Sequence, residues 1–395
     1  MTRKLIFGLM LAALAPTAAV SQEVTLQPIA AFEHDRPTAA VIDRTGRLFV
    51  SLPFGPFSGA DQVATVVEVL SDGSKRAYPN AEWNRKAVGA PSERFLNVQS
   101  LTVDGQGFLW ALDTGSPRRT GVVPGGAKLV QIDTLRDKVV RSILIGPPAL
   151  TDADSYLNDV RVDARRQVAY ITDSARGGII VVDLVRSSAR MVLASPAPPV
   201  AMAEPRRPLI VEGLTLAGAD GRAQSLATDG IALSPDGNVL YFTYRPFAGS
   251  SRLYSVRTSD LRDARMSASE LAQRVADAGP GVISDGIEFR DGVVYYTDLE
   301  RGAIACAVPG QPPQIVAQSP LLSWPDGIAF DSDGSMIVAV AQFHRVAALN
   351  AGQERGSPPY MVYRISNRGS GGARTPGTCL ADPSDRSATS DWKSR

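Results

Sequence analysis

The sequence predicts an all-β fold, a six-bladed β-propeller with one short inserted helix. A strand–turn–strand pattern recurs six times along the chain. The 395 residues include 35 glycines and 28 prolines, above the usual shares of ~7% and ~5%. Hydrophobic residues make up 44% and charged residues 21%, which excludes a coiled coil and a disordered chain. One ring of short strands therefore explains the length better than two separate domains.

Residues 1–21 have the pattern of a secretory signal peptide. Arg3 and Lys4 form a basic head, and residues 5–15 form an apolar run that is too short to span a bilayer. Ala19-Val20-Ser21 then matches a cleavage site. We expect an exported protein, secreted or periplasmic, without stable membrane insertion after signal removal. An uncleaved N-terminal anchor is the alternative.

The repeated unit indicates that residues 22–366 form the propeller. Each unit is a short strand with apolar residues two apart, a turn that holds Asp and usually Gly, and a second, more apolar strand. Third and fourth strands usually follow, which makes each unit one blade. Each first strand begins with a polar residue, and these leading residues are Thr38, Gln99, Asn158, Asp229, Asp285 and Asp326.

The two ends of the chain are expected to meet in one blade, because closing the ring removes exposed sheet edges. Val24–Phe32 and residues 360–365 are the end strands, and either of them can lie outermost. Residues 367–395 lack periodicity and predict a flexible C-terminal tail. Cys306 and Cys379 of an exported chain suggest one disulfide, with two independent thiols as the alternative.

The inserted helix is predicted between the fourth and fifth units. Ser267 and Glu270 have the spacing of a capping box. Leu271 and Val275 then fall on one helical face, and Gly279 suits a C-terminal stop. Residues 194–210, rich in Pro and Ala, predict a loop on one face of the disc.

The leading residues are expected to gather at one mouth of the central channel, because the first strand of each propeller blade lines that channel. Gln99, Asn158, Asp229 and Asp326 are candidate ligand-binding residues, with Trp324 as an adjacent aromatic. Converging carboxylates suit a hard cation or the amine of a ligand. The alternative is structural, because Asp-Gly and Asn-Asp pairs also cap turns through backbone N–H groups.

Two residues are candidates for catalysis. Asp285 can serve as a general acid or base, because crowded carboxylates raise one another's pKa. His344 follows a strand of the last blade and is a candidate base, with a buried structural histidine as the alternative. No G-x-S-x-G elbow, Gly-rich phosphate loop or H-E-x-x-H helix is present. The net charge of +1 argues against a nucleic-acid partner, and two His with two Cys are too few for a zinc cluster.

Several stretches together resemble the yellow/major royal jelly protein family. They are residues 95–100 (FLNVQS), 110–115 (WALDTG), 156–160 (YLNDV), 169–174 (AYITDS), 229–237 (DGIALSPDG), 258–263 (TSDLRD) and 324–327 (WPDG). The resemblance implies a secreted six-bladed propeller. That family is associated with pigment chemistry, nutrition and the binding of small amines or sterols. A ligand pocket would then lie at the channel mouth, lined by Asn158, Asp229, Asp285 and Asp326.

A more distant similarity is to the gluconolactonase and paraoxonase group of six-bladed propellers. It implies a calcium ion held by Asp35, Asp229 and Asp285, with Asn158 contacting an ester or lactone. The group tends to have Glu in the first blade and Asn in the fourth, where this chain has Asp35, one residue out of alignment, and Asp229. The main functional hypothesis is therefore an exported propeller that binds a small molecule at the channel mouth. A calcium-dependent lactonase or gluconolactonase-like hydrolase is the alternative, and a scaffold for protein interactions is a third possibility.

Overall fold

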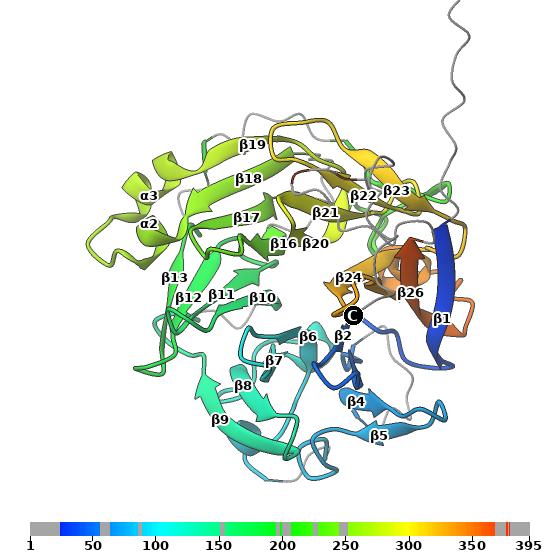
Figure 1. The fold of residues 1–395 in the computed structure, drawn as a ribbon, viewed down its shortest axis with the longest axis horizontal. Coiled ribbons are helices and arrows are strands. Elements are labelled where there is room, and N and C mark those ends of the chain that lie inside the picture. The colour runs from blue at the N-terminus through cyan, green and yellow to red at the C-terminus, as the bar shows by residue number, and fades with distance from the viewer. Residues whose placement is uncertain are drawn as a thin grey trace, which may run out of the picture.

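A computed structural model of the protein describes residues 24–55, 64–85, 89–150, 155–194, 198–199, 207–223, 228–244, 252–367, 377 and 379. Within these ranges, six four-stranded antiparallel sheets surround a central axis (Figure 1). The predicted fold class is therefore confirmed. The predicted signal peptide at 1–21 and most of the predicted tail at 367–395 lie outside the described residues. No helix in the described ranges has the length and apolar character needed to cross a membrane.

The first strand of each blade lies nearest the axis. The innermost strands are β2 (Ala39–Ile42), β6 (Val98–Val103), β10 (Leu157–Asp163), β16 (Thr228–Leu233), β20 (Ser284–Arg290) and β24 (Pro325–Phe330). The second strands are β3 (Leu48–Ser51), β7 (Leu109–Asp113), β11 (Val168–Asp173), β17 (Val239–Tyr244), β21 (Val293–Asp298) and β25 (Met336–Val340). The third strands are β4 (Val66–Val69), β8 (Lys128–Asp133), β12 (Ile179–Asp183), β18 (Arg252–Arg257), β22 (Ala303–Ala307) and β26 (Tyr360–Asn367). The outermost strands are β5 (Lys75–Ala77), β9 (Lys138–Leu144), β13 (Ser188–Val192), β19 (Ala276–Pro280), β23 (Gln314–Gln318) and β1 (Val24–Phe32).

The closing blade combines both ends of the chain. Strand β1 pairs antiparallel with β26, from Val24 opposite Asn367 to Phe32 opposite Tyr360. The N-terminal strand is therefore the outermost one, which decides between the two arrangements that the sequence allowed. The blade is completed by β25 and β24, so its inner three strands come from the C-terminal part of the chain.

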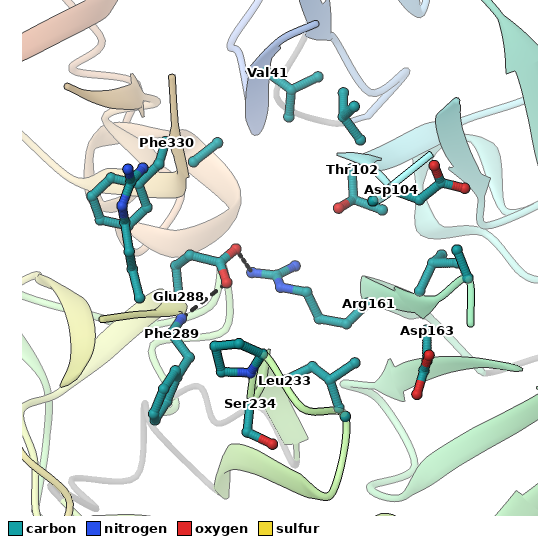
Figure 2. A pocket seen from close by; sticks show the side chains of 18 of the residues that line it. Val41, Thr102, Asp104, Arg161, Asp163, Leu233, Ser234, Glu288, Phe289 and Phe330 are labelled. Atoms are coloured by element: carbon teal, nitrogen blue, oxygen red, sulfur yellow. Dashed lines mark hydrogen bonds and ion pairs between the residues drawn. The ribbon is translucent and has the colours of Figure 1, made fainter. Parts of the chain in front are cut away.

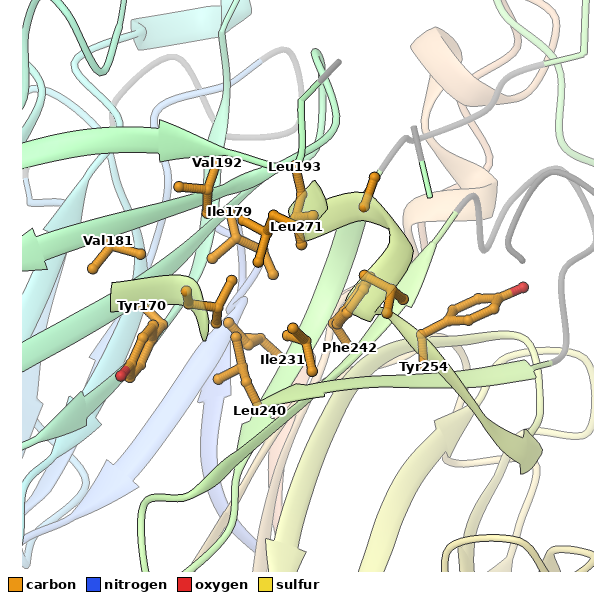
Figure 3. Packing of buried hydrophobic residues seen from close by; sticks show 14 of the residues in the cluster. Tyr170, Ile179, Val181, Val192, Leu193, Ile231, Leu240, Phe242, Tyr254 and Leu271 are labelled. Carbon is orange, nitrogen blue, oxygen red and sulfur yellow. The ribbon is translucent and has the colours of Figure 1, made fainter. Parts of the chain in front are cut away.

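Two short α-helices, α2 (Thr258–Arg262) and α3 (Ala268–Arg274), connect β18 to β19. The capping box is confirmed, because the Glu270 backbone N–H donates to Ser267 Oγ at 3.2 Å and the Ser267 N–H donates to Glu270 Oε2 at 2.9 Å. The predicted stop at Gly279 is wrong. The helix ends at Arg274 because Val275 already has extended backbone angles and leads into β19. Figure 3 shows Leu271 of α3 among the side chains packed between the third and fourth blades.

A segment that we call the strap, residues 207–223, lies between β13 and β16 and contains the hairpin β14 (Ile210–Val211) and β15 (Leu214–Thr215). Only the end of the predicted 194–210 loop falls within it. The strap packs against the connection between β25 and β26, where the short 3-10 helices η4 (Phe343–Arg345) and η5 (Ala347–Leu349) lie. Two other such turns, η1 (Pro91–Glu93) and η2 (Pro117–Arg119), belong to the second-blade region.

The two cysteines are joined. Cys306 of β22 and Cys379 form a disulfide with a Cα–Cα distance of 5.8 Å, and both residues are buried in the core between the fifth and sixth blades. The disulfide therefore attaches one residue of the predicted tail to the fifth blade.

Candidate functional site

The leading residues owe their orientation to β-bulges in the innermost strands. The register of the first hairpin shifts beside Asn158 in β10, Asp229 in β16, Asp285 in β20 and Asp326 in β24. A bulge adds one residue to a strand and re-aims its side chain, and bulges are common next to binding sites. The side chain of the polar residue at the start of each of these strands therefore does not have to follow the regular alternation of side chains between the two faces of the sheet.

The glycine after each leading aspartate allows neighbouring blades to approach closely. A Cβ atom placed on Gly230 would lie 2.6 Å from the carbonyl oxygen of Asp285. One placed on Gly286 would lie 2.6 Å from the carbonyl oxygen of Asp326. The sequence allows these Asp-Gly pairs to be turn residues, but in the structure the absence of a glycine side chain lets adjacent innermost strands approach. The carboxyl groups at their heads are crowded as a consequence.

A pocket of about 40 Å³ occupies this mouth of the channel. Its walls come from five of the six blades and are formed by Arg36, Pro53, Gln99, Arg119, Tyr156, Asn158, Asp285, Trp324, Asp326, Phe343 and Leu349. Four predicted ligand-binding residues, Gln99, Asn158, Trp324 and Asp326, thus line one pocket together with the predicted catalytic Asp285. Thr38 instead bonds to Ser51 Oγ at 3.0 Å and to the Gln99 carbonyl at 2.6 Å.

Asp229 lies directly behind the pocket wall. Its Oδ1 accepts a hydrogen bond from the Asn158 amide, and the neighbouring charge of Asp285 adds to the rise in its pKa. Asp229 is 1% exposed, so its charge is poorly solvated. Asn158 and Asp285 therefore connect this hidden carboxyl group to the pocket.

The buried carboxyl groups share raised pKa values. Burial, reinforced by the nearby charges of Asp285 and Asp159, raises the pKa of Asp229 well above its usual range. Burial and the same two neighbours also raise the pKa of Asp326. The pKa of Asp285 rises to about 6, mainly through burial, although the Trp324 hydrogen bond opposes the shift. Like charges in a desolvated site favour bound protons or a bound cation.

Trp324 has an unusual backbone that serves this cluster. Its φ angle of 59° lies in the left-handed region, which a bulky side chain rarely adopts. The fully buried indole donates its Nε1–H to Asp285 Oδ2 at 2.7 Å. Backbone strain of this kind persists only where the surrounding structure enforces it, and it is common at functional sites.

His344 lies behind Trp324 and does not line the pocket. Its ring stacks on the indole with centroids 5.8 Å apart and planes 8° apart, and its Nε2 lies 3.1 Å from Glu212 Oε2 of the strap. Burial lowers the pKa of His344, although Glu212 opposes the shift. Burial alone would raise the pKa of Glu212, but hydrogen bonds with Ser323, Arg345 and His344 lower it to about 2. His344 thus contacts the site through Trp324.

Tyr156 and Arg119 are pocket residues that the sequence analysis missed as candidates. The Tyr156 hydroxyl donates to Gln99 Oε1 at 2.7 Å, and the Arg119 guanidinium lies 4.0 Å from the centre of the Tyr156 ring. Tyr156 stands two residues before Asn158, so the repeat alignment could have indicated it. Arg119 belongs to a connection between β7 and β8 without periodicity, so no sequence signal pointed to it.

The proposed calcium ligands are not assembled as a metal site. Asp35 is not among the residues that line the pocket. Oxygens of Asp229 and Asp285 already accept N–H donors from Asn158 and Trp324. Within the described ranges, no group of three or more His, Cys, Asp or Glu side chains has an arrangement that could hold a metal ion. Asp229 Oδ2 and Asp326 Oδ2 are nevertheless buried without a hydrogen-bond partner among the described residues, so calcium binding at this mouth stays a prediction.

Comparison with protein families decides the relationship that the motifs suggested. The profile of the family described as "Major royal jelly protein" matches residues 96–350. The chain belongs to the major royal jelly protein family. The match runs from the second blade into the connection between β25 and β26, and it includes the pocket residues from Gln99 to Leu349. A comparison with curated proteins gives no match.

Solved structures resemble this royal jelly family member in fold. A luciferin-regenerating enzyme shares 12% sequence identity, with a TM-score of 0.53 over 88% of this chain and 96% of that chain. A gluconolactonase from Xanthomonas campestris also shares 12% identity, with a TM-score of 0.51 over 88% of this chain and 92% of that chain. At this identity the two comparisons support the propeller architecture.

Proposed function

We propose that this member of the major royal jelly protein family is an exported protein that binds a small molecule with a protonated amine at the channel mouth. The observation that carries the proposal is the burial of Asp229, Asp285 and Asp326 beside one pocket, each with a raised pKa. A bound ammonium group would offset the repulsion between these carboxylates, because an opposite charge nearby favours their ionised form.

The other pocket residues support an organic amine. Trp324 and Phe343 provide aromatic surface beside the carboxyl groups, and a cation is attracted to the face of such rings. The Tyr156 ring already has the Arg119 guanidinium over it. A volume of about 40 Å³ suits an ammonium head group and not a whole organic molecule. The body of the ligand would therefore extend outward, toward the connections that begin and end at this mouth.

Calorimetric titration with phenethylamine tests the proposal, with phenylacetate as the ligand of opposite charge. We expect binding of the amine alone, and Asp326→Asn should weaken it at least about tenfold, because removing one partner of a buried charge pair costs several kcal/mol. Asp72→Asn, at an exposed turn of the first blade, is the matched control and should bind normally. Equal binding of phenylacetate, or normal binding by Asp326→Asn, would contradict the proposal.

The same proposal predicts a pH dependence. Affinity for the amine should fall as the pH is lowered through about 6, because Asp285 takes up a proton there and loses its charge. The ligand amine stays protonated across this range, so the change reports on the protein. An affinity that does not change between pH 5 and 8 would contradict a role for Asp285.

A hydrolase acting on a lactone or related ester is the second candidate. The observation that favours it is the pKa of Asp285, about 6, since a general base works best near the operating pH. Asp285 would accept a proton from the water that attacks the lactone carbonyl, and would return that proton to the ring oxygen as the C–O bond breaks and this oxygen leaves as a hydroxyl. No step is assigned to calcium.

A lactone hydrolysis assay, run with and without chelator, tests this second candidate. We expect Asp285→Asn to abolish turnover and the chelator to leave it unchanged. Turnover that survives in Asp285→Asn would exclude the role of this residue. Turnover that disappears with chelator and returns with calcium would show that a metal site forms after all.

A further inference from the structure

A second, larger cavity lies at the opposite ends of the innermost strands. Its volume is about 650 Å³, within the usual range for small-molecule sites. It is lined by the ends of all six innermost strands and by the turns that follow β6, β10 and β16. The two pockets share no lining residue. Arg161 and Glu288 point toward each other across this cavity (Figure 2).

Apolar side chains form most of the wall and remain partly open to solvent. Ile42, Val103, Leu233, Phe289, Ala329 and Phe330 are all half-buried around the cavity. Apolar surface gathered in one concave place is the usual property of a binding site, whereas scattered exposed apolar residues need no explanation. The wall therefore favours a ligand with an apolar, ring-shaped body.

The ion pair gives this cavity one polar feature with spare bonding capacity. Glu288 Oε2 lies 3.1 Å from Arg161, and its Oε1 accepts the Phe289 backbone N–H at 2.9 Å. Arg161 is held in turn by the Val160 and Ile287 carbonyls at 2.9 and 2.7 Å. The Glu288 side chain keeps 22% of its surface exposed, against 11% for Arg161. Since a carboxylate accepts about four hydrogen bonds, Glu288 can accept one more from a ligand.

Charges around the cavity are balanced. The acidic lining residues are Asp104, Asp163 and Glu288, and the basic ones are Arg161, Arg165 and Arg290. Neither a cation nor an anion therefore gains from the surrounding field. We propose that this cavity is a second ligand site, which takes an uncharged aromatic alcohol whose hydroxyl donates to Glu288 and whose ring lies against the half-buried apolar wall.

Fluorescence titration with 2-naphthol tests the proposal on the whole protein. Its matched control is 2-methoxynaphthalene, which has the same rings but no hydroxyl donor. We expect 2-naphthol to bind at least about tenfold more tightly, because hydrogen bonds to charged groups contribute more than those between neutral groups. Equal affinities of the two compounds would overturn the assignment of Glu288 as the acceptor.

Two variants locate the binding. Ala329→Phe adds a ring to the apolar wall while leaving Arg161 and Glu288 in place, and should abolish 2-naphthol binding. Glu288→Gln removes the charged acceptor and should reduce the preference for 2-naphthol over its methyl ether. Circular dichroism establishes that each variant is folded. Full binding by a folded Ala329→Phe protein overturns the proposal, and so does binding that is lost in Asp326→Asn, which would place 2-naphthol at the other mouth.

Discussion

Replacing Gly286 by alanine tests how neighbouring blades meet at the channel. The new Cβ would lie 2.6 Å from the Asp326 carbonyl oxygen, whereas real Cβ contacts are essentially never below 3.0 Å. The two strands must therefore separate by at least the difference, 0.4 Å. Overpacking of this kind typically costs about 1–3 kcal/mol. Because the obstructing atom belongs to the backbone, no side-chain rotation can relieve the contact.

Urea unfolding of Gly286→Ala measures this cost, and Gly146→Ala is the matched control. A Cβ on Gly146 would meet no described atom within 4 Å, so that variant should be neutral or slightly more stable. We also expect Gly286→Ala to weaken binding at the channel mouth, because the strand that must move carries Asp326. If the two variants unfold at the same urea concentration, blade contact at the Asp-Gly pairs does not limit packing, and the reasoning is refuted.

Three further predictions concern the site and the disulfide. Asp285→Asn should increase the free energy of unfolding more at pH 7.5 than at pH 4.5. The pKa of Asp285 is about 6 in the folded protein and 3.8 in the unfolded chain. The native carboxyl group therefore costs stability as the pH rises from 3.8 to 6, and the full cost is present above pH 6. Urea unfolding at the two pH values measures the effect, and an identical increase at both would contradict it. Trp324→Phe should raise the pKa of Asp285 above 6, because the indole N–H favours the charged carboxylate. A carboxyl-selective NMR titration measures this pKa, and a value that stays at about 6 would contradict the prediction. Cys379→Ser opens a loop with a sequence separation of 73 and should lower stability by about 4 kcal/mol, as measured by denaturant unfolding against Cys306→Ser. A clear difference between the two single variants would show that more than the shared disulfide is lost.

The fold was predictable because each blade repeats the same local rules. Alternating apolar residues and Asp or Gly turns mark each hairpin. Six copies of a four-stranded unit are typical of blades that close into a ring. The order of the end strands was not predictable, because β1 and β26 have similar apolar patterns and the choice depends on long-range pairing. The end of α3 was misplaced because Val275 continues the helical spacing in sequence while its backbone is already extended.

The site was partly predictable for the same reason. Gln99, Asn158, Asp285 and Asp326 line the pocket because propeller symmetry brings equivalent positions together. Arg119 and Phe343 come from connections whose path depends on tertiary contacts, so the repeat gives no information about them. No pattern in the sequence indicates the left-handed backbone of Trp324 or the stacking of His344 on its indole.

The outermost position of β1 has a consequence for the order in which the molecule can be completed. The strand that leaves the ribosome first must wait for β26, which is made more than three hundred residues later, before its backbone finds a partner. A nascent chain therefore carries β1 unpaired and an open ring behind it. Completion of the last blade is then the step that converts an aggregation-prone arc into a closed molecule.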